Sequence, residues 1–278
     1  MSSKVPPIIL NNGVEMPQLG FGVWQVPDDE AEQAVGTALE AGYRSIDTAA
    51  IYGNEEGTGR AIAASGLPRE DIFVTTKLWN SDQGYDSTLR AFDASLEKLG
   101  LDHLDLYLIH WPLPSRGTYI DTYKALEKLH ADGRVRAIGV SNFLPEHLRR
   151  LVSETSVVPA VNQIELHPHL QQHASRELHA EQGIATEAWS PLGQGKGLLE
   201  VPAIVAIAQK HDRTPRPGRA ALARPARQRR DPEVGHAVPD QGEHRGVRLQ
   251  PGRRGPRGDQ RAQRGPAPGP DPATFDMS

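Results

Sequence analysis

The sequence predicts an α/β fold, a (β/α)8 barrel that is incomplete as written. Short apolar runs alternate with amphipathic helical stretches in βαβα order through residues 1–214. Polar residues stand at the ends of several of the apolar runs. A chain of 278 residues also suits one barrel domain, since single barrels commonly have ~250 residues.

The first expected element is a β-hairpin ahead of the main fold. Ile8 to Leu10, and Val14 with Met16, supply apolar side chains on either side of Asn11-Asn12-Gly13, a sequence typical of a tight turn. We expect this hairpin to cap the bottom of the barrel.

Seven strands and six helices are expected after the hairpin. The strand-like runs are residues 19–23, 45–46, 72–76, 104–109, 137–140, 161–164 and 184–189. The amphipathic stretches are residues 29–41, 55–64, 87–99, 119–130, 146–152 and 172–180. Repeated βα units form either an open doubly wound sheet or a closed barrel, because their crossovers are right-handed.

Polar residues at strand ends distinguish these two folds. A barrel gathers its active site from the carboxyl ends of many strands, whereas an open sheet binds its ligand at one switch point beside a glycine fingerprint. Gly20-Phe21-Gly22 lacks the third glycine of that fingerprint. The strand-end polar residues, which favour the barrel, are Asp47, Lys77, His110, Ser141, Asn142, Gln163, Trp189 and Ser190.

Four ionisable residues, Asp47, Tyr52, Lys77 and His110, form a candidate catalytic set. A lysine at the end of an apolar strand needs a partner, and Asp47 can supply one. Lys77 close to a phenol would lower the pKa of Tyr52 from its reference of ~10, which suits a proton relay. Histidine offers a second hydrogen-bond donor to a carbonyl oxygen. These roles suit carbonyl reduction, in which negative charge develops on that oxygen.

Three of the four tryptophans follow strand ends. We expect Trp24, Trp79 and Trp111 to line an aromatic substrate pocket, although ordinary packing at the top of the barrel is the alternative.

Several other motifs receive structural interpretations. His167 and His169 form an H-x-H pair, but no further ligand set accompanies it, so a loop-structural role is favoured over a metal site. Residues 53–59 are glycine-rich but lack the Lys-Ser/Thr ending of a phosphate loop, so they indicate a helix start. Three histidines are expected to be solvated on exposed helical stretches: His147, His173 and His179.

Composition limits the cellular setting. The chain has no cysteine, which excludes disulfides and thiolate metal sites, and MSSKVPPIIL lacks the long apolar run of a signal peptide. Cytoplasmic residence without membrane association is therefore expected. Residues 215–278 carry 13 Arg against 7 acids, but this tail lacks lysine and interleaved aromatics, so nucleic-acid binding is not expected.

Seven motifs in order resemble landmarks of the aldo-keto reductase family: GFGVWQ, RSIDTAAIYGNE, VTTKLWNSDQG, LDLYLIHWP, AIGVSNF, AVNQIELHP and EAWSPL. The chain most resembles the bacterial branch that includes 2,5-diketo-gluconate reductases. The resemblance implies a barrel that uses NADPH to reduce carbonyls, with Tyr52 as general acid, Lys77 and Asp47 tuning it, and His110 orienting the substrate. A monomer is the family-like expectation.

The same resemblance implies a set of cofactor contacts. Ser141, Asn142 and Gln163 would hold the carboxamide, and Trp189 would stack on the nicotinamide ring. The remaining implied cofactor-binding residues are Gly22, Val23 and Asp47, together with Ser190, Leu192 and Gly193 at the pyrophosphate.

The segment 215–268 departs from the family pattern. Its 13 Arg, 9 Pro and 8 Gly accompany only two Leu and three Val, so no strand or long helix is predicted and the composition is that of a disordered segment. The family expects a helix, the eighth strand and a 2′-phosphate-binding lysine here. Without that strand, the first and seventh strands would keep unpaired edges.

Frameshifts are our hypothesis for this segment. Read one base later with GC-rich codons, residues 216–227 can encode a helix typical of the family, and residues 231–234 can encode Ile-Pro-Lys-Ser. The chain then divides into a barrel at 1–214, the altered segment at 215–268, and a family-like tail at 269–278. A non-catalytic barrel that binds only cofactor or partners is the alternative to an active reductase.

Overall fold

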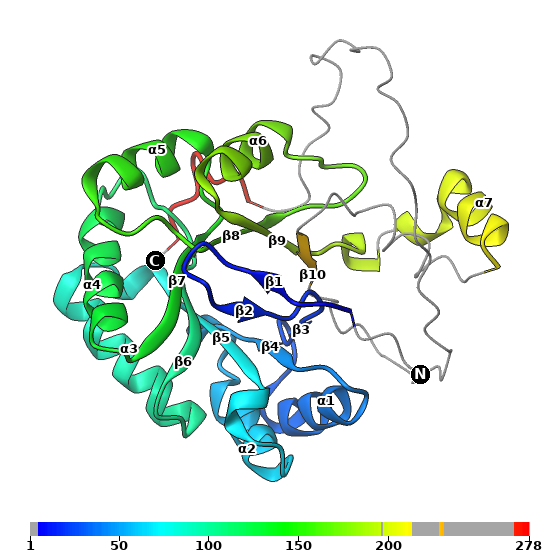
Figure 1. The fold of residues 1–278 in the computed structure, drawn as a ribbon, viewed down its shortest axis with the longest axis horizontal. Coiled ribbons are helices and arrows are strands. Elements are labelled where there is room, and N and C mark those ends of the chain that lie inside the picture. Colours follow the sequence, from blue (N-terminus) through cyan, green and yellow to red (C-terminus); the bar gives the residue numbers. More distant parts are fainter. Residues whose placement is uncertain (1–4, 196, 213–227, 231–269, 278) are drawn as a thin grey trace.

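A computed structural model describes residues 5–195, 197–212, 228–230 and 270–277. Its main feature is a curled parallel sheet of eight strands in the order β10-β9-β8-β7-β6-β5-β4-β3, with α1 to α6 outside it (Figure 1). This is the predicted α/β class, an incomplete (β/α)8 barrel.

The strands β1 to β9 fall where the apolar runs predict them, and β10 has no predicted counterpart. Their bounds are β1 Ile8–Ile9, β2 Glu15–Met16, β3 Phe21–Gly22, β4 Ser45–Asp47, β5 Phe73–Leu78, β6 Leu104–Ile109, β7 Val135–Ser141, β8 Val161–Glu165, β9 Ala185–Trp189 and β10 Gln228–Arg230. The seven predicted barrel strands correspond to β3 through β9, and their pairing is parallel throughout.

The helices follow the amphipathic stretches. Their bounds are α1 Asp28–Glu40, α2 Glu55–Ala64, α3 Tyr85–Leu99, α4 Tyr119–Ala131, α5 Pro145–Glu154, α6 His173–Gln182 and α7 Pro202–Lys210. The six predicted helices are confirmed, and α7 has no counterpart among them. In Figure 1, α7 lies to one side of the ring formed by the other helices. None of the helices in the described ranges is long and apolar enough to cross a bilayer.

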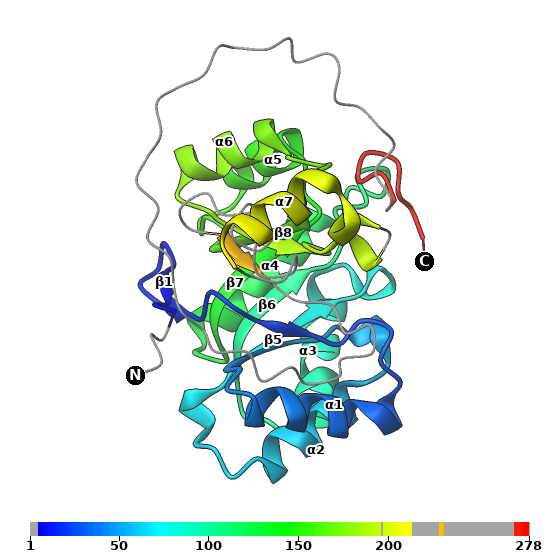
Figure 2. The same ribbon diagram turned by 90° about the vertical axis from the view of Figure 1, so that its right-hand side faces the viewer.

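The amino-terminal hairpin is confirmed and covers one end of the sheet. β1 pairs with β2 in antiparallel register, Ile8 opposite Met16. The turn is fastened to the sheet because Asn12 Nδ2 donates to Arg136 O at 2.9 Å and Asn11 Nδ2 donates to Pro159 O at 3.1 Å. Figure 2 shows the hairpin beside the sheet, with its strands far from α5 and α6.

Alternation along the strands separates two hydrophobic regions. On β6, Leu106 and Leu108 pack with Ile8 and Met16 of the hairpin. Tyr107 and Ile109 point the other way and join the layer between sheet and helices. The hairpin therefore plugs the amino end of the sheet interior and leaves the carboxyl end for the site.

Two glycines bring α2 close to its neighbours. A β-carbon at Gly57 would collide with the backbone oxygen of Asp28 on α1, and one at Gly59 would collide with that of Leu99 on α3. This close packing fixes the start of α2, which confirms the interpretation of residues 53–59 as a helix start.

The expectation that no strand would form within 215–268 is wrong at three residues. β10 pairs with β9 in parallel, Gln228 opposite Thr186 and Arg230 opposite Ala188. A strand ladder is made by backbone groups, so the open edge of β9 can be paired by a segment with no apolar pattern. Within the described ranges no strand pairs with the outer edge of β3, which leaves the sheet open there. The rest of the predicted disordered or frameshifted segment lies outside the described residues.

The carboxyl-terminal tail lies across the loops that follow β5 and β6. The rings of Phe275 and Trp111 have centroids 4.3 Å apart. Arg116 Nε donates to Asp276 Oδ1 at 2.6 Å, and Asn80 Nδ2 donates to the backbone oxygen of Met277 at 2.7 Å. The last described residues are thus attached to the end of the sheet opposite the hairpin.

Candidate active site

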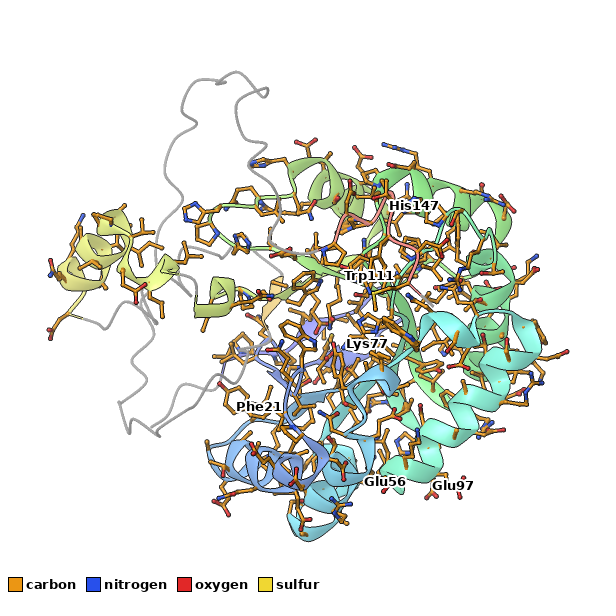
Figure 3. All side chains as sticks on the ribbon, turned by 180° about the vertical axis from the view of Figure 1, so that it is seen from behind. Phe21, Glu56, Lys77, Glu97, Trp111 and His147 are labelled. Atoms are coloured by element: carbon orange, nitrogen blue, oxygen red, sulfur yellow. The ribbon has the colours of Figure 1, made fainter. Side chains whose placement is uncertain are left out.

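The predicted site residues gather at the carboxyl ends of the strands. Figure 3, which views the molecule from behind relative to Figure 1, has Lys77 and Trp111 near the middle of the sheet. Lys77 lies on β5, Asp47 ends β4, and His110 follows β6 directly. The sheet order makes these three strands neighbours, so residues far apart in the sequence become adjacent.

Lys77 and Asp47 form a buried ion pair, as the sequence predicts. Lys77 Nζ donates to Asp47 Oδ1 and also to the backbone oxygen of Thr48, at 2.9 Å for the latter. The two side chains are 1% and 6% exposed. Burial lowers the pKa of Lys77, but the charge of Asp47 outweighs it, with help from Tyr52 and Glu187, so the pKa lies above its ordinary value. Lys77 therefore carries a permanent positive charge.

Tyr52 lies next to that charge. It ends the short 3-10 helix Ala50–Tyr52 and is half-buried. Lys77 Nζ is 5.3 Å from the centroid of the tyrosine ring. The phenol and the ammonium group thus share one corner of the site, which is the arrangement that the sequence predicts.

His110 completes the group from a third strand. Its ring centroid is 5.8 Å from that of Tyr52, with the two rings nearly perpendicular. Burial, together with the positive charge of Lys77, lowers the pKa of His110 well below its usual value, so the imidazole is neutral near pH 7. A neutral imidazole keeps one N–H donor, and this permits the predicted role beside a carbonyl oxygen.

Two of the three tryptophans stand beside His110. The ring centroid of Trp79 is 5.2 Å from that of His110, and the ring of Trp111 lies nearly parallel to it at 6.4 Å. Trp111 is buried under Phe275, whereas Trp24 is 40% exposed and makes no ring contact with them among the described residues. Only Trp79 and Trp111 are therefore brought together with the histidine.

Asn54 is a site-building residue that the sequence reading missed. It is fully buried, and its Nδ2 donates to Val23 O and Val26 O, both at 2.8 Å. Its Oδ1 accepts from Thr48 Oγ1 at 2.6 Å. Asn54 therefore ties the tyrosine loop to the ends of β3 and β4. The signal available in the sequence was its position two residues after Tyr52, in the quoted motif.

A second buried carboxylate was also missed. Gln163 Nε2 donates to Asp47 Oδ2 and to Glu187 Oε1, both at 2.8 Å. Glu187 is fully buried on β9. An acid in the middle of the run that ends at Trp189 was the available signal, because buried acids require partners.

The residues expected to hold the carboxamide of the cofactor form one hydrogen-bonded group. Ser141 Oγ and Asn142 N both bond to the backbone oxygen of Gln163, at 3.0 and 2.9 Å. Asn142 Nδ2 donates to His110 O at 3.0 Å, and Trp189 Nε1 donates to Asn142 Oδ1 at 3.0 Å. The structure brings these residues together at the ends of β7, β8 and β9.

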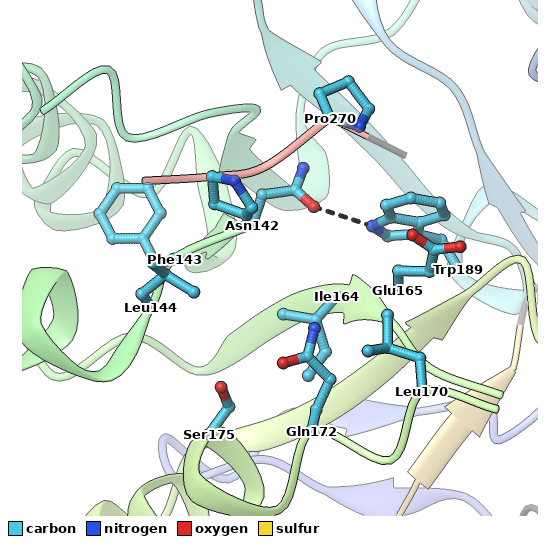
Figure 4. Close-up of a pocket in the computed structure, with 11 residues that line it drawn as sticks. Asn142, Phe143, Leu144, Ile164, Glu165, Leu170, Gln172, Ser175, Trp189 and Pro270 are labelled. Atoms are coloured by element: carbon cyan, nitrogen blue, oxygen red, sulfur yellow. Dashed lines mark hydrogen bonds between the residues drawn. The ribbon is translucent and has the colours of Figure 1, made fainter. Parts of the chain in front are cut away.

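A pocket adjoins this group (Figure 4). Asn142 and Trp189 lie on one side of it, and the hydrogen bond between them is drawn as a dashed line. The other lining residues come from the ends of β7 and β8, from the loop and start of α6, and from the carboxyl-terminal tail: Phe143, Leu144, Ile164, Glu165, Leu170, Gln172, Ser175, Pro270 and Pro272.

The remaining predicted cofactor residues flank the same end of the sheet. Gly22 is paired with Asp47 across the β3–β4 ladder, and Val23 N donates to Asp47 O at 3.1 Å. After β9 the backbone has positive φ at Ser190 (48°) and Gly193 (63°), and Gly193 N donates to Ser190 O at 2.9 Å. Leu192 lies within this turn and is partly exposed.

Two of the three histidines expected to be solvated are buried. His147 Nδ1 accepts from Leu144 N at 3.2 Å at the start of α5, and its ring lies beside Tyr119 and Phe143. His179 is 1% exposed, because α6 turns it onto the sheet. The prediction failed since polar side chains can occupy a buried helix face when strand residues supply hydrogen bonds. His173 is exposed as expected.

His167 occupies a tight loop. Its backbone exchanges hydrogen bonds with Leu170, at 3.2 and 2.9 Å, and its Nε2 lies 3.2 Å from Glu165 Oε1. The ring of His169 is 6.4 Å away. Across the described part of the chain, no three acidic or histidine side chains are grouped as metal ligands.

Comparison with known proteins agrees with this geometry. The model of the aldo/keto reductase family matches residues 17–217. An aldo-keto reductase of Mycolicibacterium smegmatis is 64% identical over 210 residues, which are 76% of each chain. The glyoxal reductase of Bacillus subtilis is 54% identical over 206 residues, 74% of each chain.

Solved structures show the same fold. An aldo/keto reductase from Brucella melitensis superposes with a TM-score of 0.80 at 55% identity, covering 83% of this chain and 88% of that one. A mutant of Gox0644 crystallised in complex with NADPH has a TM-score of 0.76 at 48% identity and covers 82% of both chains. The chain therefore belongs to the aldo/keto reductase family.

Proposed function

We propose that the chain is an NADPH-dependent oxidoreductase that reduces aldehydes or ketones to alcohols, with Tyr52 as the general acid. The observation that carries the proposal is the buried Lys77–Asp47 pair with Lys77 Nζ 5.3 Å from the Tyr52 ring centroid. A related chain is named glyoxal reductase, and another, from Trypanosoma cruzi, is named 9,11-endoperoxide prostaglandin H2 reductase.

The residues present fit a nicotinamide cofactor. Asn142 and the flat indole of Trp189 line the pocket of Figure 4, and Ser141 and Gln163 belong to the same hydrogen-bonded group as Asn142. Ser141 and Trp189 are proposed to hold the nicotinamide end, with Gly22 and Val23 near it. Ser190, Leu192 and Gly193 would meet the pyrophosphate from the turn after β9, where Ser190 and Gly193 have positive φ. When bound, NADPH supplies the hydride.

The protein's own residues would stabilise and protonate the substrate oxygen. Lys77 stays charged and favours negative charge on the neighbouring phenol, so Tyr52 can release its proton to the oxygen as charge develops there. Asp47 holds Lys77 in place. Neutral His110 would donate a hydrogen bond to the same oxygen and orient the carbonyl.

Aromatic side chains are proposed to receive the rest of the substrate. Trp79 and Trp111 flank His110, and Trp24 would close the pocket from the loop after β3. Such walls favour apolar or aromatic groups next to the carbonyl. A cytoplasmic monomer acting on a small carbonyl compound is the setting that we propose.

The three-part organisation of the chain is also a proposal. Residues 1–214 would form the barrel, 215–268 the altered segment and 269–278 the tail. Sequencing the DNA for residues 210–270 tests the frameshift hypothesis, because bases that cannot encode a family-like helix and strand in a neighbouring frame would exclude it.

Replacing Tyr52 by phenylalanine tests the proposed function. The substitution removes the proton and keeps the ring, so we expect turnover of glyoxal with NADPH to fall at least about 100-fold while NADPH still binds. NADPH oxidation followed at 340 nm measures the first and fluorescence titration the second. Undiminished turnover in this variant would contradict the assignment of Tyr52.

A specific observation favours the alternative, a barrel that binds cofactor or partners without turnover. No strand pairs with the outer edge of β3 within the described ranges. Val23, the residue after β3, accepts a hydrogen bond from Asn54, which lies two residues after Tyr52, so the open edge adjoins the loop that carries the proposed acid. Wild-type protein that binds NADPH but oxidises none of it with glyoxal would support this alternative.

A further inference from the structure

Asn142 has an unusual backbone conformation at the end of β7. Its φ is +62°, in the left-handed region that non-glycine residues seldom occupy. This conformation places its side chain between two site groups, the backbone oxygen of His110 and the indole of Trp189. Such a conformation persists only when its surroundings hold it.

Asn162, the second residue of β8, bonds to both the backbone N–H and the backbone oxygen of Phe143. Its Nδ2 donates to Phe143 O at 2.9 Å, and its Oδ1 accepts from Phe143 N at 3.4 Å. The side chain is fully buried. Because Phe143 follows Asn142 directly, these two bonds restrain the turn that carries the Asn142 amide.

His179 in turn orients Asn162. The Asn162 Nδ2 and His179 Nε2 atoms are 2.9 Å apart, and His179 Nδ1 is 2.8 Å from Thr186 Oγ1. The amide nitrogen can only donate, so Nε2 must accept and the ring proton must be on Nδ1, donating to Thr186. Donation therefore runs from Asn162 through His179 to Thr186, and Asn162 also donates to the backbone oxygen of Phe143 in the turn.

Packing alone does not explain why these buried residues are polar. Three polar side chains are buried between α6 and the sheet, where apolar residues of similar size would avoid the need for matched partners. Asn142, Phe143 and Trp189 all line the pocket of Figure 4, so the restrained turn is also a wall of that pocket.

We propose that Asn162, His179 and Thr186 form a positioning chain that holds the Asn142 turn in its binding geometry for the nicotinamide end of the cofactor. The inference rests on the proposed function, since it assigns Asn142 to the cofactor. All three side chains are buried, and in this proposal they act through the turn alone.

The protonation state of His179 agrees with this arrangement. Burial, with the positive charge of Arg176, lowers the pKa of His179 to about 4. The imidazole therefore stays neutral near pH 7 and remains able to accept at Nε2.

The test compares NADPH affinity in four variants by fluorescence titration. In His179→Leu, Asn162 loses its acceptor, and in Thr186→Val the ring loses its partner. We expect the dissociation constant for NADPH to rise about ten-fold in His179→Leu, the order expected for one unmade buried hydrogen bond, and by less in Thr186→Val. His179→Gln can accept from Asn162 and donate to Thr186, so we expect it to restore most of the affinity.

The control is Asp105→Asn, which disturbs a buried polar group at the opposite end of the sheet. We expect it to lower the melting temperature and leave NADPH affinity within two-fold of wild type. Unchanged affinity in His179→Leu would overturn the positioning chain, as would equal weakening in His179→Gln or in the control. If His179→Leu does not fold, the NADPH affinities of Thr186→Val and His179→Gln are compared instead. Weaker binding in Thr186→Val than in His179→Gln would support the positioning chain, and equal binding in the two would overturn it. Absence of NADPH binding by the wild type would instead overturn the proposed function, and the positioning chain with it.

Discussion

The two ends of the sheet each hold a buried aspartate, and their partners differ in kind. At the amino end, Asp105 on β6 accepts at Oδ2 from Arg69 Nη2 at 2.8 Å and from Val74 N at 2.9 Å, and at Oδ1 from Arg136 Nη1 at 2.7 Å. The two arginine side chains are 22% and 44% exposed. This carboxylate is therefore neutralised by groups that also reach water.

At the carboxyl end, Asp47 is paired with a lysine that is 1% exposed and with the amide of Gln163. Both charged side chains are buried from solvent, and they lie beside the half-buried phenol of Tyr52. We propose that these similar buried acids serve different purposes: Asp105 stabilises the fold, and Asp47 keeps a charge beside the proposed substrate site.

Replacing Lys77 by methionine should have the largest effect on the carboxyl end. The variant removes the charge beside Tyr52 and leaves Asp47 without its cation, so we expect kcat to fall about 1,000-fold. Steady-state NADPH oxidation measures the loss, with circular dichroism as the check that the chain is folded. A folded variant with kcat within three-fold of wild type would remove the distinction between the two ends.

Replacing Asp105 by asparagine should show the opposite behaviour. The amide cannot accept from all three donors, and both arginines lose their carboxylate. We therefore expect the free energy of unfolding to fall by about 3 kcal/mol, a value kept low because both arginines reach solvent. Urea unfolding measures it. We expect kcat to be unchanged, and a ten-fold loss of kcat would mean that the amino end also contributes to reactivity.

We expect acid to lower the free energy of unfolding through the protonation of His179. The unfolded chain binds a proton at this histidine below pH 6.5, whereas in the folded chain the pKa is about 4. The contribution of His179 to stability is therefore complete well above pH 6.5 and is lost as the pH decreases toward 4, by about 2 kcal/mol between pH 8 and 5. Urea unfolding at these two pH values measures the change. The His179→Gln variant should show a smaller decrease, and an equal decrease would assign the effect elsewhere.

The sequence was sufficient for elements whose side chains carry a pattern. The strands β3 to β9 and the polar strand ends at Asp47, Lys77 and His110 could be predicted, because apolar runs mark buried strands and barrel geometry gathers polar residues at their carboxyl ends. β10 could not, since its pairing with β9 uses backbone groups that every residue has. The seventh helix, α7, was not predicted either. It follows an irregular loop with two 3-10 turns, 193–195 and 198–200, and the glycines of this loop are more typical of a turn than of the approach to a helix.

Polar residues that act through other residues were the harder part of the site. Asn54 and Glu187 look ordinary in the sequence because their partners lie on other strands. His179 was expected to be solvated, yet its partners are on β8 and β9. A helix pattern shows which residues share a face, but the hydrogen bonds that make a polar residue acceptable on the buried face are long-range. The membership of the 2,5-diketo-gluconate reductase-like branch stays a prediction.

The double role of the Asn142 amide has a thermodynamic consequence. One end of this group bonds to the strand end that carries His110, and the other end bonds to the indole of Trp189. A ligand that moves the indole would act through this amide on the strand end that carries His110, and the two halves of the site would then be energetically coupled. Linkage is reciprocal, and whatever factor a bound cofactor adds to the affinity for a carbonyl compound, that compound must add to the affinity for the cofactor.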